Sequence, residues 1–176
     1  MGWSQIFLNV EFAKNGKLTG ESEFEGFEGQ IVLLDFDWSL GVNQDVPQKN
    51  ADPIRKPAFS PLSLTKRFDA SSIKLMSCLQ SRDPIVKARI TVAHRVNDTE
   101  GTLRQAFAIE IEKARLESVT LNMNSMGNSI ILQEDISIRY AKIKVEQYAI
   151  GADGRYKSTA KIYRSQFQDA IDLNET

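Results

Sequence analysis

The sequence of 176 residues is poor in cysteine, histidine and proline, and neither sign of charge is in excess. Its single cysteine, Cys78, cannot form an internal disulfide bond, so the chain is suited to folding in a reducing compartment. Metal sites built from several cysteines and histidines are excluded, because the chain has one of each. The 22 Lys and Arg residues balance 23 Asp and Glu residues, which argues against a phosphate-backbone partner such as nucleic acid.

Long hydrophobic runs are also missing. No apolar stretch approaches the roughly 18 residues that a transmembrane helix needs. The first eleven residues contain no basic residue, and their short apolar run ends at Glu11, which is unlike a secretory signal peptide. These residues alone lead us to expect a cytoplasmic protein that does not insert into membranes.

What the chain does contain is a series of short segments in which apolar and polar residues alternate, the period of a half-buried strand. The predicted strands are 5–12, 30–39, 58–68, 85–95, 103–112, 116–123, 136–148 and 156–163. Turn residues separate them, and the pair Asp153-Gly154 predicts a tight hairpin before the last strand.

The alternation changes phase within the segment 136–148. Ile136, Ile138 and Tyr140 share one parity, whereas Ile143 and Val145 take the other. A β-bulge near Ala141-Lys142 explains this change, and so does a strand whose faces meet different environments along its length.

One helix is predicted, directly after a strand. The alternating residues from Leu62 give way at Asp69, a plausible N-cap, to the apolar stripe of Ile73, Met76 and Leu79, with Cys78 beside it. The predicted fold is therefore mainly β: an antiparallel β-barrel or sandwich with one short α-helix packed against it. We expect a single domain over residues 1–176, long enough to bury about 70% of the surface that its unfolded form exposes.

Two segments lack periodicity. Residues 43–57 carry Pro47, Pro53 and Pro57, which exclude a central strand or a helix and predict a long loop. Residues 166–176 form a polar tail that we expect to fray.

Candidates for chemistry are few. His94 lies at the end of a predicted strand with no carboxylate placed beside it, and Cys78 lies on an apolar helical stripe, as a small core residue does. The segment Gly151–Gly154 superficially resembles a phosphate-binding loop but lies between strands, so we interpret it as a turn.

Two of the predicted strands each carry a pair of acidic residues. Asp35 and Asp37 project from one strand face, as do Glu110 and Glu112, and such pairs either serve acid–base chemistry or discourage stray strand pairing. The second interpretation is the simpler one, so we predict no catalytic, cofactor-binding or metal-binding residues.

Basic residues also alternate along the predicted strands, which is typical of a sheet face in contact with solvent. If several copies formed a ring, the same residues could line its central channel. They are Lys66-Arg67, Lys87 and Arg89, Lys113 and Arg115, and Lys142 and Lys144. Trp3 and Trp38 are expected to pack in or beside the core.

Four motifs occur in a fixed order along the chain. They are Ile6-Phe7-Leu8 with Gly20-Glu21-Ser22; Ile31 to Ser39; Thr65-Lys66 followed by Phe68-Asp69, Ser71-Ser72 and Leu75; and Glu134 to Tyr148 with Tyr140-Ala141-Lys142-Ile143. Their order and spacing resemble the Hcp family, the haemolysin-coregulated tube subunits of type VI secretion systems. The chain departs from the family pattern at Ile73, where proline is usual, and in residues 43–56, where the family has a Gly-rich loop for ring-to-ring contacts.

The resemblance implies a structural subunit rather than an enzyme. It implies a homohexameric ring that stacks into the inner tube of the apparatus, carries effectors, and meets sheath and spike proteins. It also implies secretion without a cleaved signal peptide. Two alternatives stay open from the residues themselves: a monomeric ligand- or peptide-binding β-barrel with residues 43–57 as a lid, and an enzyme using Asp35, Asp37 or Cys78.

Overall fold

The computed structural model describes residues 4–42, 57–95, 102–126, 129–150 and 156–166. In chain order its elements are β1 (Ser4–Phe12), β2 (Gly16–Lys17), β3 (Ile31–Asp37), β4 (Leu40–Val42), β5 (Pro57–Phe59), β6 (Leu62–Arg67), α1 (Ser72–Gln80), β7 (Ile85–Arg95), β8 (Leu103–Met126), β9 (Ser129–Ile150) and β10 (Tyr156–Gln166). The predicted loop at 43–57 and tail at 166–176 fall almost wholly outside the described residues.

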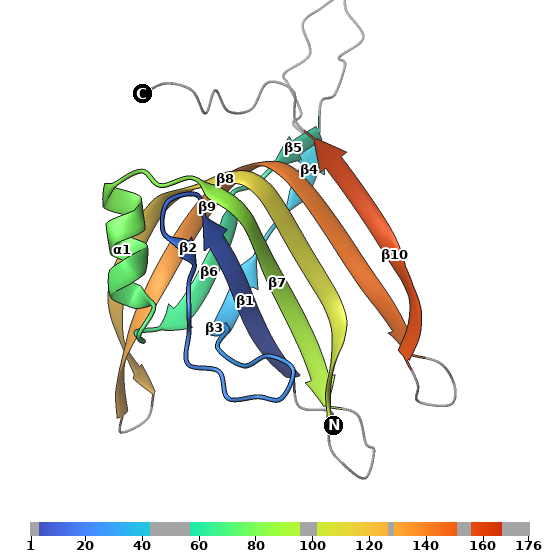
Figure 1. Cartoon of the computed structure of the whole chain (residues 1–176), viewed down its shortest axis with the longest axis horizontal. Helices are drawn as coiled ribbons and strands as arrows, with labels where there is room; N and C mark the ends of the chain where they lie inside the picture. Colours follow the sequence, from blue (N-terminus) through green and yellow to red (C-terminus); the bar gives the residue numbers. More distant parts are fainter. Residues whose placement is uncertain (1–3, 43–56, 96–101, 127–128, 151–155, 167–176) are drawn as a thin grey trace, which may run out of the picture.

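Six strands close into an antiparallel barrel, which confirms the predicted fold class. The strand order is β9, β6, β3, β1, β7 and β8, and the barrel closes because β8 also pairs with β9. Figure 1 shows α1 at one end of this barrel and β10 at the other, where β10 extends the sheet beside the last part of β9. Among the described residues no helix is long and apolar enough to cross a membrane.

The barrel interior is filled by alternate side chains of all six strands. These buried residues include Leu8, Val10, Phe12, Ile31, Leu33, Leu62, Leu64, Ala88, Ile90, Ile109, Ile111, Ile136, Ile138 and Ile143. Branched aliphatic side chains suit a closed, strongly twisted sheet because they pack tightly on a pleated surface.

Aromatic residues finish the packing at the barrel's rim. Trp38 lies beside the core, as predicted, and its indole Nε1–H donates a hydrogen bond to the Tyr140 hydroxyl at 2.5 Å. That hydroxyl in turn donates to the carbonyl of Ser60 at 2.9 Å. On the outer side of β1, Phe7 is covered by Phe24 and Phe27 from the loop between β2 and β3. The rings of Phe7 and Phe27 are stacked, with their centroids 4.3 Å apart.

Two turns are fixed by specific groups. Gly20 has no room for a side chain, since a Cβ there would lie 2.5 Å from the Gln30 carbonyl oxygen. Buried Asp83 accepts hydrogen bonds from the backbone of Lys14 and Asn15 and from the Asn15 side chain, at 2.7–2.9 Å. Although its burial works in the opposite direction, these hydrogen bonds hold the pKa of Asp83 below its usual value.

The predicted strands were mostly right, and their differences from the structure have local causes. The segments 103–112 and 116–123 are one strand, β8, in which Lys113 takes a left-handed backbone (φ 50°) instead of ending the strand. The short strands β2 and β4 were not predicted, because two and three residues show no period.

The pairing of β9 with β8 shows no register shift at Ala141-Lys142, so the prediction of a bulge there was wrong. β9 keeps its register with β8 through this point, and the register shift lies instead between Leu116 and Ser118 of β8. β9 pairs with β6 up to Ile138 and with β10 from Lys142 onward. The neighbours of β9 therefore change along its length, while Ile138 and Ile143, of opposite parity, both belong to the core; the parity changes at Tyr140 and Ala141, which are both buried.

The helix exists, but the predicted stripe was one position off. The residues that α1 buries are Ser72, Leu75 and Cys78; Met76 and Leu79 are half-buried, and Ile73 is 63% exposed. The helix begins at Ser72, with Ser71 as N-cap, so the prediction of Asp69 as N-cap was wrong. The Asp69 carboxylate does accept the Ser71 N–H at 2.9 Å, just before the first turn.

Replacement of Leu75 tests this helix register. We expect Leu75→Ala to lower the free energy of unfolding by about 2–5 kcal/mol, through lost transfer energy and the cavity left behind. Ile73→Ala, two positions away on the exposed face, is the matched control and should change it by less than about 0.5 kcal/mol. Urea denaturation of both variants measures the difference; equal losses would contradict the register.

Candidate functional site

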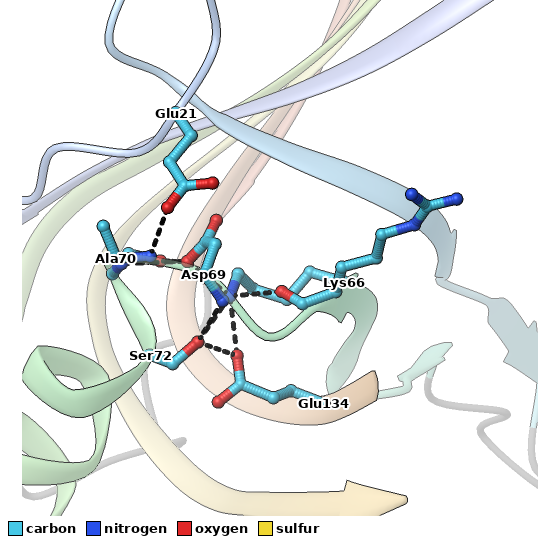
Figure 2. Close-up of polar contacts among 8 residues, drawn as sticks. Glu21, Lys66, Asp69, Ala70, Ser72 and Glu134 are labelled. Carbon is cyan, nitrogen blue, oxygen red and sulfur yellow. Dashed lines mark hydrogen bonds and ion pairs between the residues drawn. The ribbon is translucent and has the colours of Figure 1, made fainter. Parts of the chain in front are cut away.

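The most unusual polar group in the structure is a completely buried lysine. Lys66 lies on the core-facing side of β6, and neither it nor Glu134 of β9 has any exposed side-chain surface. The Lys66 Nζ donates to Glu134 Oε2 at 2.6 Å, to Asp69 Oδ1 at 2.8 Å and to Ser72 Oγ at 3.0 Å (Figure 2). Burial of a charge without such partners costs several kcal/mol, so this set of contacts is required for the lysine to lie there.

The cluster extends to both sides of the lysine. Ser72 Oγ donates to Glu134 Oε2 at 2.7 Å and accepts the backbone N–H of Asp69 at 2.9 Å. Glu21, from the loop after β2, accepts the backbone N–H of Ala70 at 2.9 Å (Figure 2). We call Glu21, Lys66, Asp69, Ser72 and Glu134 the lysine cluster.

The lysine cluster joins segments that are far apart in sequence. It connects the loop after β2, the end of β6, the start of α1 and the first part of β9 at one point. Glu21, Lys66, Asp69 and Ser72 belong to the motifs that resemble the Hcp family, and Glu134 opens another of them. In the structure, residues from these separate motifs are therefore hydrogen-bonded to one another and hold parts of the fold together. The Lys66 Nζ also donates to the backbone carbonyl of Arg67 at 2.8 Å, so four oxygen atoms surround it.

A second polar network covers the outer face of β7, β8 and β9. The register places Asn9, Arg89, Glu110, Lys144 and Arg164 in one row across β1, β7, β8, β9 and β10. Glu11, Lys87, Glu112, Lys142 and Gln166 form the next row. Opposite charges therefore meet between β7, β8 and β9, the arrangement that stabilises a sheet face, whereas Lys144 faces the like charge of Arg164 across β9 and β10.

Two carboxylates hold this charged face together. Glu110 is paired with Lys87, Arg89 and Lys144 at 3.0–3.2 Å. Glu146 is paired with Arg89 and Lys144, each at 2.7 Å, and also accepts the Tyr148 hydroxyl at 3.0 Å.

The neighbouring cations decide the protonation of both acids. Burial favours the neutral acid, yet hydrogen bonds from Lys144, Arg89 and Tyr148 lower the pKa of Glu146 to about 2. Burial is likewise outweighed at Glu110, where Lys87 and Lys144 lower the pKa. Both groups are carboxylates at neutral pH with their charge compensated, so neither is suited to act as a general acid.

The other predicted candidates do not come together. Asp35 and Asp37 are exposed on β3, and Asp35 Oδ1 accepts the backbone N–H of Phe36 at 2.8 Å. His94 Nδ1 lies 2.6 Å from the Ser4 hydroxyl. Cys78 is completely buried, and its burial, with Asp83 nearby, raises the pKa of its thiol, as expected of an inert core residue. In the described part of the chain no group of three or more His, Cys, Asp or Glu is placed to hold a metal ion.

Comparison with known proteins agrees with the motif order. The sequence model of the family described as "Type VI secretion system effector, Hcp" matches residues 7–147. No curated protein sequence matches the chain significantly.

Several solved structures share the fold. A mutant of Hcp1 from the E. coli EAEC 042 pathovar superposes with a TM-score of 0.74 at 18% identity, covering 93% of this chain and 98% of that one. Hcp1 from Salmonella typhimurium superposes with a TM-score of 0.68 at 15% identity, covering 97% of this chain and 98% of that one. The secreted protein Hcp3 from Pseudomonas aeruginosa superposes with a TM-score of 0.64 at 18% identity, covering 94% of this chain and 99% of that one.

Removal of the buried ammonium tests the role of the lysine cluster. We expect Lys66→Met to destabilise the fold by about 3–5 kcal/mol, because Glu134 is left buried without its counter-ion. Adding Glu134→Gln to Lys66→Met should recover part of that loss. Lys87→Met is the control, because it removes the half-exposed Lys87 from its ion pair with Glu110 on the outer face. This change should lower the free energy of unfolding by about 1 kcal/mol or less. Chemical denaturation compares the three variants with the wild type; a Lys66→Met variant as stable as the wild type would show that the cluster does not support the fold.

The lowered pKa of Glu146 predicts a pH dependence. A carboxylate whose pKa falls from 4.5 to about 2 on folding stabilises the native state above pH 4.5, and this contribution is lost as the pH falls toward 2. Glu146→Gln should therefore lower the free energy of unfolding by about 1–3 kcal/mol at pH 7. The difference in this free energy between the variant and the wild type should become smaller as the pH falls from 5 to 3. Urea melts of both proteins across that range measure it, and a difference independent of pH would rule out ionisation as the cause.

Proposed function

Since the chain belongs to the Hcp family of type VI secretion proteins, we propose that this tube subunit works as a closed hexameric ring. The observation that carries the proposal is the family match, which spans residues 7–147 and therefore the whole barrel with α1. Residues 1–176 act as one domain in this proposal. Transport is driven by other parts of the apparatus, so the subunit needs no catalytic activity of its own.

The structure supports an assembly role in two ways. The barrel interior is filled by core side chains, unlike a binding barrel that keeps a ligand cavity. Within the described residues β10 pairs on one side only, with β9, and so presents a sheet edge. An edge of this kind invites pairing unless a neighbour covers it, and a neighbouring subunit of the ring does so.

The partners follow from the same proposal. Rings stack into the inner tube inside the sheath, end at the spike, and carry effector proteins in the lumen. The subunit leaves the producing cell through this apparatus. The charged face is one candidate lining for the lumen, because its paired charges present a hydrated surface with little net field.

The oligomeric state tests the proposal directly. Six copies of the 19.8 kDa chain weigh about 119 kDa, and we expect this mass from light scattering coupled to gel filtration. Negative-stain images should show closed rings. Monomers alone, at protein concentrations up to the millimolar range, would contradict a ring-forming subunit.

A further inference from the structure

The far end of the β8–β9 hairpin exposes an unusual amount of apolar surface. Leu121, Met123, Ile130 and Leu132 are between 39% and 71% exposed. We call these four residues the hairpin patch. Met123 lies directly opposite Leu132 across the hairpin, and Ser125 lies opposite Ile130. All four point to the side on which Val119 and Ile136 contact the core, so the patch continues the core beyond the barrel.

The opposite side of the same hairpin is polar. Asn122 is hydrogen-bonded to Asp135, and Asn124 to Gln133, across the two strands. Thr65 of β6 donates to the same Asp135 at 2.9 Å. The polar ladder satisfies one face of the hairpin, whereas contiguous exposed apolar side chains on the other face mark an interaction surface.

An apolar groove of about 810 Å³ lies beside β10. Its lining includes Phe107 of β8, Val145 of β9 and Tyr163 of β10, with Tyr163 directly opposite Val145. The Phe107 ring is stacked on Phe36, and Tyr163 is 41% exposed. We call this groove the β10 groove.

The hairpin patch and the β10 groove cannot meet within one molecule. Figure 1 shows the free end of the β8–β9 hairpin next to α1 at one end of the barrel and β10 at the other. Two different surfaces at opposite ends are what a head-to-tail contact between identical subunits needs, and such contacts close into rings when the rotation between neighbours allows it.

The charges at the two ends are also complementary. Residues 116–138, which form the hairpin, contain three acidic residues and no basic one. Glu134 is paired internally with Lys66, Glu117 is paired with Arg139 at 2.6 Å, and Asp135 lies on the polar face of the hairpin. Residues 156–166, the strand β10, contain three basic residues and no acidic one. The remaining difference in charge favours contact between the two unlike ends over contact between two like ends.

We propose that the hairpin patch of one subunit packs into the β10 groove of the next copy, and that this contact forms the side-to-side interface of the ring. This inference rests on the proposed ring. It names the two surfaces that make the ring and assigns the exposed edge of β10 to the neighbour's hairpin.

A matched pair of variants tests the hairpin. Met123→Asp places a charge in the patch, and Asn124→Asp places the same charge one residue away on the polar face. We expect Met123→Asp to lower the ring fraction at least tenfold and Asn124→Asp to leave it within about twofold of the wild type. Tyr163→Asp in the groove should act like Met123→Asp. Circular dichroism and thermal melts establish that each variant is folded.

Mixing the two defective variants distinguishes a head-to-tail contact from a symmetric one. Met123→Asp keeps an intact groove and Tyr163→Asp keeps an intact hairpin, so a mixture can form one good contact per pair. We expect one-to-one dimers in the mixture and monomers of each variant alone. Rings that survive both substitutions, while the wild type forms rings, would overturn this interface and leave the proposed function standing; a wild type without rings would overturn the proposed function itself.

Cysteine crosslinking provides a test that does not depend on a disruptive charge. Subunits with Met123→Cys should form disulfide-linked pairs with subunits carrying Tyr163→Cys under mild oxidation. Asn124→Cys with Tyr163→Cys is the control and should link at least tenfold less. Equal yields of the two pairs would place the hairpin patch elsewhere than in the β10 groove.

Discussion

The ion pair between Lys66 and Glu134 is the constraint on which the other features depend. Both side chains are completely buried, so neither can be stabilised by water, and each must find its partners within the chain. Those partners come from the residues that lead into α1 and from the first part of β9, and Glu21 holds the backbone of Ala70 just before the helix. A displacement of any of these segments leaves a charge unpaired. The pair therefore specifies the arrangement of helix, loop and hairpin more strongly than apolar packing alone.

Charge is used differently on the outer face. There each carboxylate is shared by several cations, so charges of both signs are compensated where they lie and the face remains partly hydrated. A surface of this kind has little attraction for a partner of either sign. Of the eleven large apolar side chains that are exposed among the described residues, six lie in the hairpin patch or line the β10 groove. In the proposed ring, contact with cargo and contact with neighbouring subunits would therefore use different surfaces of one barrel.

The sequence predicted most of the described strands and the helix, because the alternation and spacing of apolar residues are local properties. It did not reveal that Lys66 is buried, since a lysine after Leu-Ser-Leu-Thr is ordinarily solvated. One signal was present: Lys66 continues the parity of Leu62 and Leu64, which face the core. Its partner Glu134 lies 68 residues away, and no local pattern encodes that contact. The helix register was misjudged for a related reason, because Leu75 and Ile73 are equally apolar and the neighbouring β8 decides which is buried.

The position of Glu134 connects the fold to assembly. It lies where β9 leaves the barrel, directly opposite Leu121 of the hairpin patch and two residues from Leu132. A two-stranded extension has little intrinsic rigidity, so its direction is set where it is attached to the barrel. Lys66 anchors that point from β6, and Thr65 holds the polar side of the same hairpin through Asp135. The angle between neighbours in a closed ring leaves little tolerance in the direction of a protruding contact. A buried salt bridge that adds little net stability is then retained for the geometry it imposes, because an apolar pair at the same place would pack without fixing the hairpin's direction.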